Sequence, residues 1–260
     1  MATDTLERRF GAIGARVKVV RPVARGRSGL IDVGSDKRGE FFELRVAGNR
    51  AVSLDVVDVD PDDRALLLLA REGGEKSKFL CGFDERHWFV AAIPESAKGV
   101  TGVVRAKEAL QPEAVRDAVA RVKPKDRFRR RNVAYVRQGE WFFLPHWELD
   151  VDERHVLRNE PLTRGYGNRH IMEFAFRRGG EDVYVNPEHP TGITEAEFQA
   201  LPPTKQRSGD WDHMVRDPEL YAKGSVRHPD HNTIVLPYWQ RVRMNTEQRA
   251  RAMRHVAFLD

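Results

Sequence analysis

The sequence predicts an α+β fold built mainly from antiparallel β-hairpins, with short helices that cover the sheets. Short apolar runs alternate with turn sequences between residues 40 and 93, and again after residue 132. Between these two regions, residues 96–122 change to a helical spacing of apolar residues. The chain is therefore expected to divide into an N-terminal meander with a helical pair, residues 1–125, and a hairpin-rich C-terminal part, residues 126–260. The alternative is a single domain.

The N-terminal part is expected to begin with a short helix over Thr5–Ile13 and a strand at Val17–Val20. Five further strands are predicted at Phe41–Val46, Val52–Val59, Leu66–Ala70, Phe79–Cys81 and Trp88–Ile93. Because short turns join them, neighbouring strands should pair antiparallel. Two helices then follow, separated at Pro112, since proline is well tolerated in the first turn of a helix. Both helices are expected to cover the preceding sheet.

The C-terminal part is expected to contain two hairpins and three helical segments. Val133–Val136 and Trp141–Leu144 should pair around Gly139, which can adopt the left-handed conformation of a hairpin loop. A second hairpin is predicted from Phe174 to Val185. The predicted helical segments are Thr194–Ala200, where Thr194 and Glu197 form a capping box, Trp211–Tyr221, and Asn245–His255.

Composition restricts the function classes. The 260 residues include 44 Lys+Arg and 39 Asp+Glu, a net charge of +5 that favours polyanionic partners. The single cysteine, Cys81, excludes intrachain disulfides and thiolate zinc sites, so a divalent metal ion would need histidines and carboxylates. The N-terminus lacks the apolar core of a signal peptide, and the longest apolar run, residues 65–70, is far short of the ~20 residues that span a bilayer. A cytoplasmic protein without a membrane partner is therefore expected.

The segment from Gly224 to Asn245 concentrates the residues suited to chemistry. His228, Asp230 and His231 lie in one turn between two extended runs, and imidazole and carboxylate groups are ligands of zinc, manganese and iron. A further ligand, or a residue that orients a ligand, is expected upstream, from His213, Asp217 or Glu219, with His213 or Asp217 as the first choice for the ligand. The alternative interpretation is a polar turn in which Asp230 bonds to its own backbone.

These residues predict a metal-dependent hydrolase of phosphodiesterase or nuclease type, in which His228, Asp230 and His231 act as ligands or general base. Arg227 or Arg241 would then contact the substrate phosphate. His170 begins an apolar strand face and is interpreted as a core residue. No phosphate-binding glycine loop, nucleophile elbow or His-Glu-x-x-His motif is present.

Two basic groups favour a different function, nucleic-acid binding. The first lies in the steepest charge run and comprises Lys123, Lys125, Arg127, Arg129, Arg130 and Arg131. The second comprises Arg227, Trp239, Arg241 and Arg243, where strand alternation places the tryptophan on the same side as Arg241 and Arg243. The leading hypothesis is a nucleic-acid-binding protein that assists a larger assembly of protein subunits. The alternative functions are the metal-dependent hydrolase and a scaffold that binds protein through aromatic hairpins. The first basic group has a second interpretation, as a solvated linker without a ligand.

Overall fold

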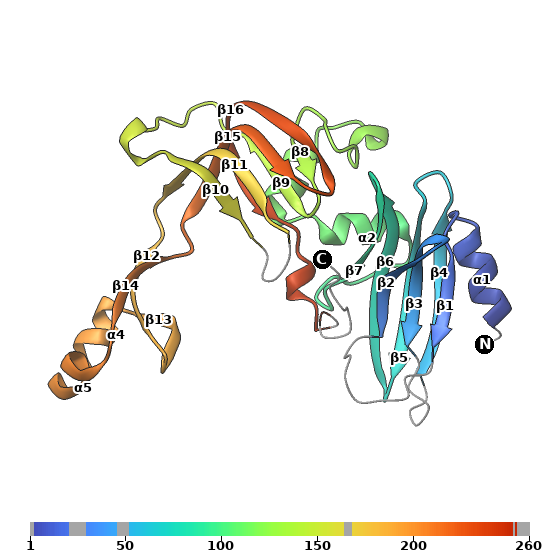
Figure 1. Cartoon of the computed structure of the whole chain (residues 1–260), viewed down its shortest axis with the longest axis horizontal. Coiled ribbons are helices and arrows are strands. Elements are labelled where there is room, and N and C mark those ends of the chain that lie inside the picture. The colour runs from blue at the N-terminus through green and yellow to red at the C-terminus, as the bar shows by residue number, and fades with distance from the viewer. Residues whose placement is uncertain (1–2, 21–29, 46–51, 164–167, 252, 254–260) are drawn as a thin grey trace.

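The computed structural model describes residues 3–20, 30–45, 52–163, 168–251 and 253. These residues form four sheets and several short helices, and the predicted α+β class is confirmed. Figure 1 shows two packed sheets at the N-terminal side, a larger sheet beside them, and an extended arm beyond it. None of the helices in this described part is long and apolar enough to span a membrane.

The first N-terminal sheet follows helix α1 (Thr3–Gly11) and has the order β1-β3-β2. Its strands are β1 (Val17–Val20), β2 (Ile31–Asp36) and β3 (Gly39–Arg45), with β1 parallel to β3 and β2 antiparallel to it. The second sheet is the predicted meander, with the order β4-β5-β6-β7. Its strands are β4 (Val52–Asp60), β5 (Ala65–Glu72), β6 (Glu75–Asp84) and β7 (His87–Ala92).

Strand β5 explains how these layers hold together. Its first six residues, Ala65–Ala70, are all buried. Leu66, Leu68 and Ala70 belong to the core shared with the first sheet and α1, whereas Ala65 and Leu67 pack with helix α2 (Val103–Leu110). Side chains alternate between the faces of a strand, so a continuous apolar run requires cover on both faces. The predicted covering role of this helix is therefore correct.

The large C-terminal sheet has the order β10-β11-β15-β16-β9-β8, and all its pairs are antiparallel. Its strands are β8 (Val136–Gln138), β9 (Trp141–Pro145), β10 (Leu157–Leu162), β11 (His170–Arg178), β15 (Glu219–His228) and β16 (His231–Met244). Helix α3 (Glu113–Val119) packs on it through Val115 and Val119, which belong to a cluster that includes Phe142. The expectation that this second helix covers the preceding N-terminal sheet is therefore wrong. Short 3-10 turns lie at Pro124–Asp126, Glu153–His155 and Glu247–Arg249.

The arm is a separate three-stranded sheet with the order β13-β12-β14 (Figure 1). It contains β12 (Glu181–Asn186), β13 (His189–Thr194), α4 (Glu195–Gln199), α5 (Pro203–Ser208) and β14 (Asp212–Arg216). The capping box predicted at the start of α4 is confirmed: Thr194 Oγ1 accepts from the Glu197 amide, and the Glu197 carboxylate accepts from the Thr194 amide.

Three secondary-structure predictions are wrong. The run from Phe174 to Val185 is not a hairpin, because β11 pairs with β10 and β15 whereas β12 pairs with β13 and β14. Residues 211–221 form strand β14 and the start of β15 instead of a helical turn. The predicted helix at Asn245–His255 is replaced by a 3-10 turn within residues 245–251, and most of its remainder lies outside the described residues. The division near residue 125 stays a prediction.

Candidate metal centre and cleft

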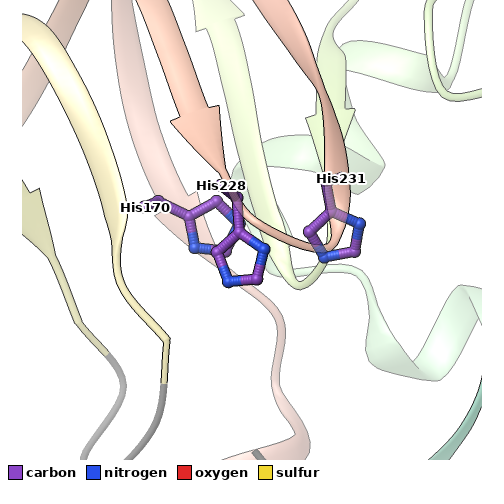
Figure 2. A group of neighbouring side chains, drawn as sticks. All are labelled: His170, His228 and His231. Carbon is purple, nitrogen blue, oxygen red and sulfur yellow. The ribbon is translucent and has the colours of Figure 1, made fainter.

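Three histidines meet where strands of the large sheet end (Figure 2). His170 is the first residue of β11, His228 is the last of β15, and His231 is the first of β16. The register pairs Ile171 with Arg227 and His228 with His231, so antiparallel pairing brings the three strand ends to one edge. Pro229 and Asp230 form the two-residue connection between the last two histidines.

The three imidazoles lie within reach of a single ion. Their ligand nitrogens are all within 4.8 Å of one another, and the ring centroids of His170 and His228 are 4.2 Å apart. The nitrogens of a tetrahedral zinc site are about 3.3–3.4 Å apart, given Zn–N distances of about 2.0–2.1 Å. The cluster could therefore hold a metal ion after a small convergence of the rings.

His170 is the most unusual member of the cluster. Its side chain is buried, and its Nε2 has no hydrogen-bond partner among the residues that the structure describes. Burial, followed by the adjacent His228 and His231, lowers the pKa of His170 to about 3. A buried polar atom without a partner is costly unless something satisfies it, and a neutral imidazole nitrogen is the form that binds metal. His170 is buried, as expected of a core residue, but its Nε2 is not satisfied by any of the described residues.

Gly139 leaves the space beside the rings open. It lies in the turn between β8 and β9 with φ +55°, and a Cβ at this position would lie 3.0 Å from His231 Nε2 and 3.5 Å from His170 Nε2. The neighbouring Gln138 side chain is buried and donates to the Asn232 and Val226 carbonyls. That side chain therefore fixes this turn against the β15–β16 hairpin.

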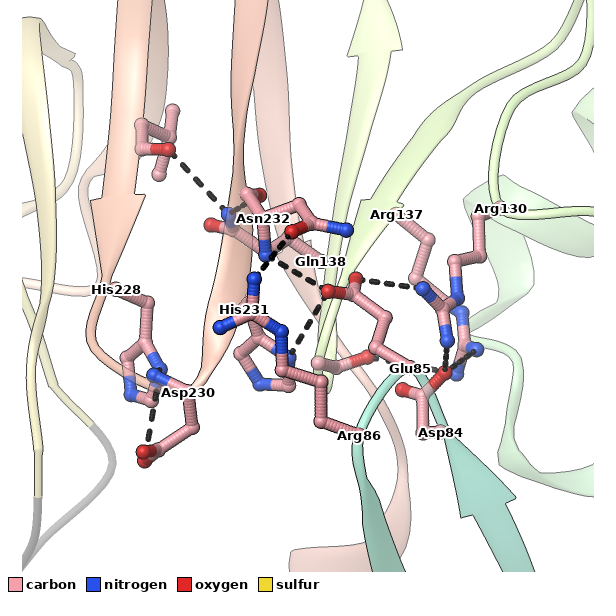
Figure 3. A network of polar contacts seen from close by, with 12 residues as sticks. Asp84, Glu85, Arg86, Arg130, Arg137, Gln138, His228, Asp230, His231 and Asn232 are labelled. Carbon is pink, nitrogen blue, oxygen red and sulfur yellow. Dashed lines mark hydrogen bonds and ion pairs between the residues drawn. The ribbon is translucent and has the colours of Figure 1, made fainter.

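The two hairpin histidines have carboxylates nearby. His231 Nδ1 lies 3.9 Å from Glu85 Oε2, and Glu85 is held by the Asn232 amide at 2.7 Å and by Arg130 at 2.7 Å (Figure 3). Metal-binding histidines commonly have a carboxylate at their second nitrogen, which orients the ring. The pKa of His231 is lowered, mainly by burial.

His228 is held more closely by its surroundings. Its Nδ1 accepts from the Asp230 amide at 3.1 Å and lies 3.9 Å from the Asp230 carboxylate, while its Nε2 lies 3.3 Å from the Asn168 carbonyl. Because Nδ1 accepts, the proton of the neutral ring lies on Nε2, which donates to this carbonyl. Ion binding at His228 Nε2 would move this proton to Nδ1 and replace both contacts.

The cluster opens into a cleft of about 530 Å³ that both halves of the chain line. Its walls include apolar groups such as Leu80, Trp88 and Phe142, which provide contacts for an apolar ligand. The lysine and arginine side chains that line the cleft are Lys107 and Arg137. Six carboxylates also line it: Glu40, Asp63, Asp84, Glu140, Asp230 and Glu247. The cleft is therefore acidic in spite of the basic composition of the whole chain.

Several residues that the sequence singled out lie away from this cluster. His213 is exposed on β14 of the arm, where it faces Asp182 at 3.6 Å, so the expected fourth ligand is not supplied by His213. Arg241 and Arg243 both pair with Glu219, and Arg227 donates to Asn159. Among the described residues, none of these arginines lines the cleft. The expected contact of Arg227 or Arg241 with a substrate phosphate therefore has no support at this site.

Three of the six side chains of the first basic group contact other residues of the chain. Arg127 donates to the Val122 carbonyl, Arg129 pairs with Asp126 at 3.1 Å, and Arg130 binds Asp84 and Glu85 of the β6–β7 turn (Figure 3). Lys123, Lys125 and Arg131 are exposed and form no ion pair with the residues described. On β16, Trp239 is half-buried, and Lys223 approaches its ring to 5.9 Å.

Sequence reasoning missed the residues that the fold brings to this site from a distance. His170, Gly139 and Glu85 are far from the histidine turn in the chain, and none belongs to a recognisable motif. The available signal was weak: a histidine at the start of an apolar strand, and a turn glycine before a strand. Comparisons of the chain with protein-family models, curated proteins and solved structures found no match.

Proposed function

We propose that this protein is a metal-dependent hydrolase whose ion is held by His170, His228 and His231. The observation that supports this most directly is the convergence of three imidazoles, with a buried His170 Nε2 that has no hydrogen-bond partner among the described residues. A zinc ion held by three histidines keeps a position open for water or substrate and acts there as a Lewis acid.

The chain's own residues would hold and shape this centre. Glu85, whose carboxylate lies 3.9 Å from His231 Nδ1, would orient the ring of His231 through its second nitrogen. Asp230, expected from the sequence as a ligand, is not one of the three clustered residues; its backbone amide donates to His228 Nδ1. The missing side chain at Gly139 leaves room beside the two Nε2 atoms. The apolar walls of the cleft would hold the substrate and reduce its contact with water.

The charge of the cleft favours a neutral or cationic substrate. Lys107 pairs with Asp63 and Arg137 pairs with Asp84, so both cations of the cleft are already neutralised. The remaining carboxylates would disfavour a phosphodiester, which is an anion. We therefore propose an ester or amide of a carboxylic acid in place of the phosphodiester that the basic composition favoured.

Hydrolysis of simple chromogenic esters tests this function. The zinc-loaded full chain is expected to hydrolyse 4-nitrophenyl acetate faster than an equal concentration of free zinc, and to prefer it over bis(4-nitrophenyl) phosphate. Removal of zinc with a chelator should abolish the activity, and added zinc should restore it. Purified protein that binds no zinc at the stoichiometry of one ion per chain would contradict the proposal.

Nucleic-acid binding is a second candidate, supported by the exposed cations Lys123, Lys125 and Arg131, which form no ion pair within the described part of the chain. Replacing all three with alanine should weaken binding of a fluorescein-labelled duplex and lower the salt slope by about 0.9 per lost phosphate contact. Fluorescence anisotropy over a salt series measures both. The matched control replaces Lys37, Arg38 and Lys98, which are exposed elsewhere. If the two triple variants bind the duplex equally well, residues 123–131 are a linker and do not contact nucleic acid.

A further inference from the structure

A histidine–carboxylate pair from the N-terminal half also lines the cleft. His87 is the first residue of β7, and its Nδ1 lies 2.7 Å from Glu40 Oε1 on β3. The other oxygen of Glu40 accepts from the Trp88 amide at 2.9 Å. Both carboxylate oxygens are thus fixed, and one of them orients the imidazole.

The pair is tied to the histidine cluster by a single turn. Residues 84–87 connect β6 to β7, and this turn carries Glu85 to His231. His87 follows Glu85 by two residues on the same turn. His87, His228 and His231 line the same cleft, so one substrate held there can be reached from both groups.

The arrangement suits proton transfer. When a carboxylate accepts from Nδ1–H, the imidazole keeps the tautomer whose Nε2 lone pair can take up a proton. The side chain of His87 is 50% exposed, so water in the cleft has access to the ring. His170 is unsuited to this task because it is buried.

We propose that His87 is the proton-transfer residue of this cleft and that Glu40 is its positioning residue. The inference rests on the proposed hydrolase function. As the oxygen of a water molecule bonds to the carbonyl carbon of the ester, a proton of that water passes to His87 Nε2. When the bond from this carbon to the alcohol oxygen breaks, His87 returns the proton to the leaving oxygen. The products are an acid and an alcohol, and no other reactant is consumed.

The test compares variants of the zinc-loaded full chain with 4-nitrophenyl acetate as the probe. H87Q is expected to lower kcat by about 10²–10⁴-fold, with KM and zinc affinity unchanged. H87A should behave similarly and recover activity when imidazole is added, relative to wild-type protein in the same imidazole. The matched control is H155Q, because His155 also lies near a carboxylate, Asp152 at 3.9 Å, but does not line the cleft.

The positioning role of Glu40 is tested by a measurement of the His87 tautomer, in addition to activity. Nitrogen-15 chemical shifts of His87 should show the Nδ1–H tautomer in wild-type protein and a mixture of tautomers in E40Q. If wild-type protein hydrolyses the ester and H87Q retains the wild-type kcat, the assignment of His87 is wrong and the hydrolase proposal stands. If wild-type protein shows no zinc-dependent hydrolysis, the hydrolase proposal fails and the role of His87 fails with it.

Discussion

Replacing His231 or His170 with alanine is expected to lower zinc affinity by more than about 100-fold. Loss of a residue that merely orients a ligand costs about 10–100-fold, so loss of a ligand should cost more. Isothermal titration with zinc measures the change. The matched control is H213A, which removes an exposed histidine on the arm and should leave affinity unaltered.

Because His170 is buried, its variant needs a second measurement that separates binding from folding. Each protein can be unfolded by denaturant with and without zinc. At a free zinc concentration of 100 times Kd, binding should stabilise the wild type by about 2.7 kcal/mol. The same zinc should leave the free energy of unfolding of H170A and H231A nearly unchanged. Full zinc-dependent stabilisation of either variant would remove that residue from the proposed ligands.

Gly139 supplies an independent test that keeps all three imidazoles. G139A places a methyl group 3.0 Å from His231 Nε2 at a backbone position with φ +55°. Alanine is strained at such a φ, so the apo protein should also lose some stability. If the ion occupies the space beside Gly139, the zinc-dependent stabilisation should fall as well, and its persistence would place the ion elsewhere.

The largest expected effect on stability comes from Asp32. Its side chain is 3% exposed and accepts from Arg45, whose side chain is 7% exposed, at 2.8 Å. D32A would leave the Arg45 guanidinium buried, with Glu43 as its remaining charged partner. Removing one partner of a buried ion pair costs about 3–5 kcal/mol. Denaturant unfolding monitored by circular dichroism measures the loss.

Two further variants separate the charge from the packing. D36A removes a carboxylate that pairs with Arg16 and Lys18 at the surface, where ion pairs stabilise proteins little, so its effect should be much smaller. The double variant D32L/R45M replaces the buried pair with apolar groups and should recover most of the stability. A D32A protein as stable as D36A would show that the buried pair has no stabilising role.

The elements best predicted from the sequence depend on neighbours in the chain. The meander from β4 to β7, the helices on either side of Pro112 and the capping box at Thr194 each follow from local spacing. The failure at residues 174–185 has a different cause. Two extended runs joined by Gly179 and Gly180 form a hairpin only when they pair with each other, and here each pairs with strands from elsewhere.

The histidine turn shows the same division within the candidate site. That His228 and His231 are close follows from the sequence alone, because two residues separate them in a tight connection between strands. The sequence also shows that a metal ion could not be bound by cysteines, since Cys81 is alone. These properties require no knowledge of distant contacts.

Only the tertiary structure decided which residue completes the cluster. The register of β11 against β15 places His170 beside His228, and the β8–β9 turn places Gly139 beside two ring nitrogens. The fold likewise gathers carboxylates into a cleft of a basic protein and pairs Arg241 and Arg243 with Glu219. Net charge is a sum over the whole chain, whereas a ligand responds to the charges nearest to it, and strand pairing sets those distances.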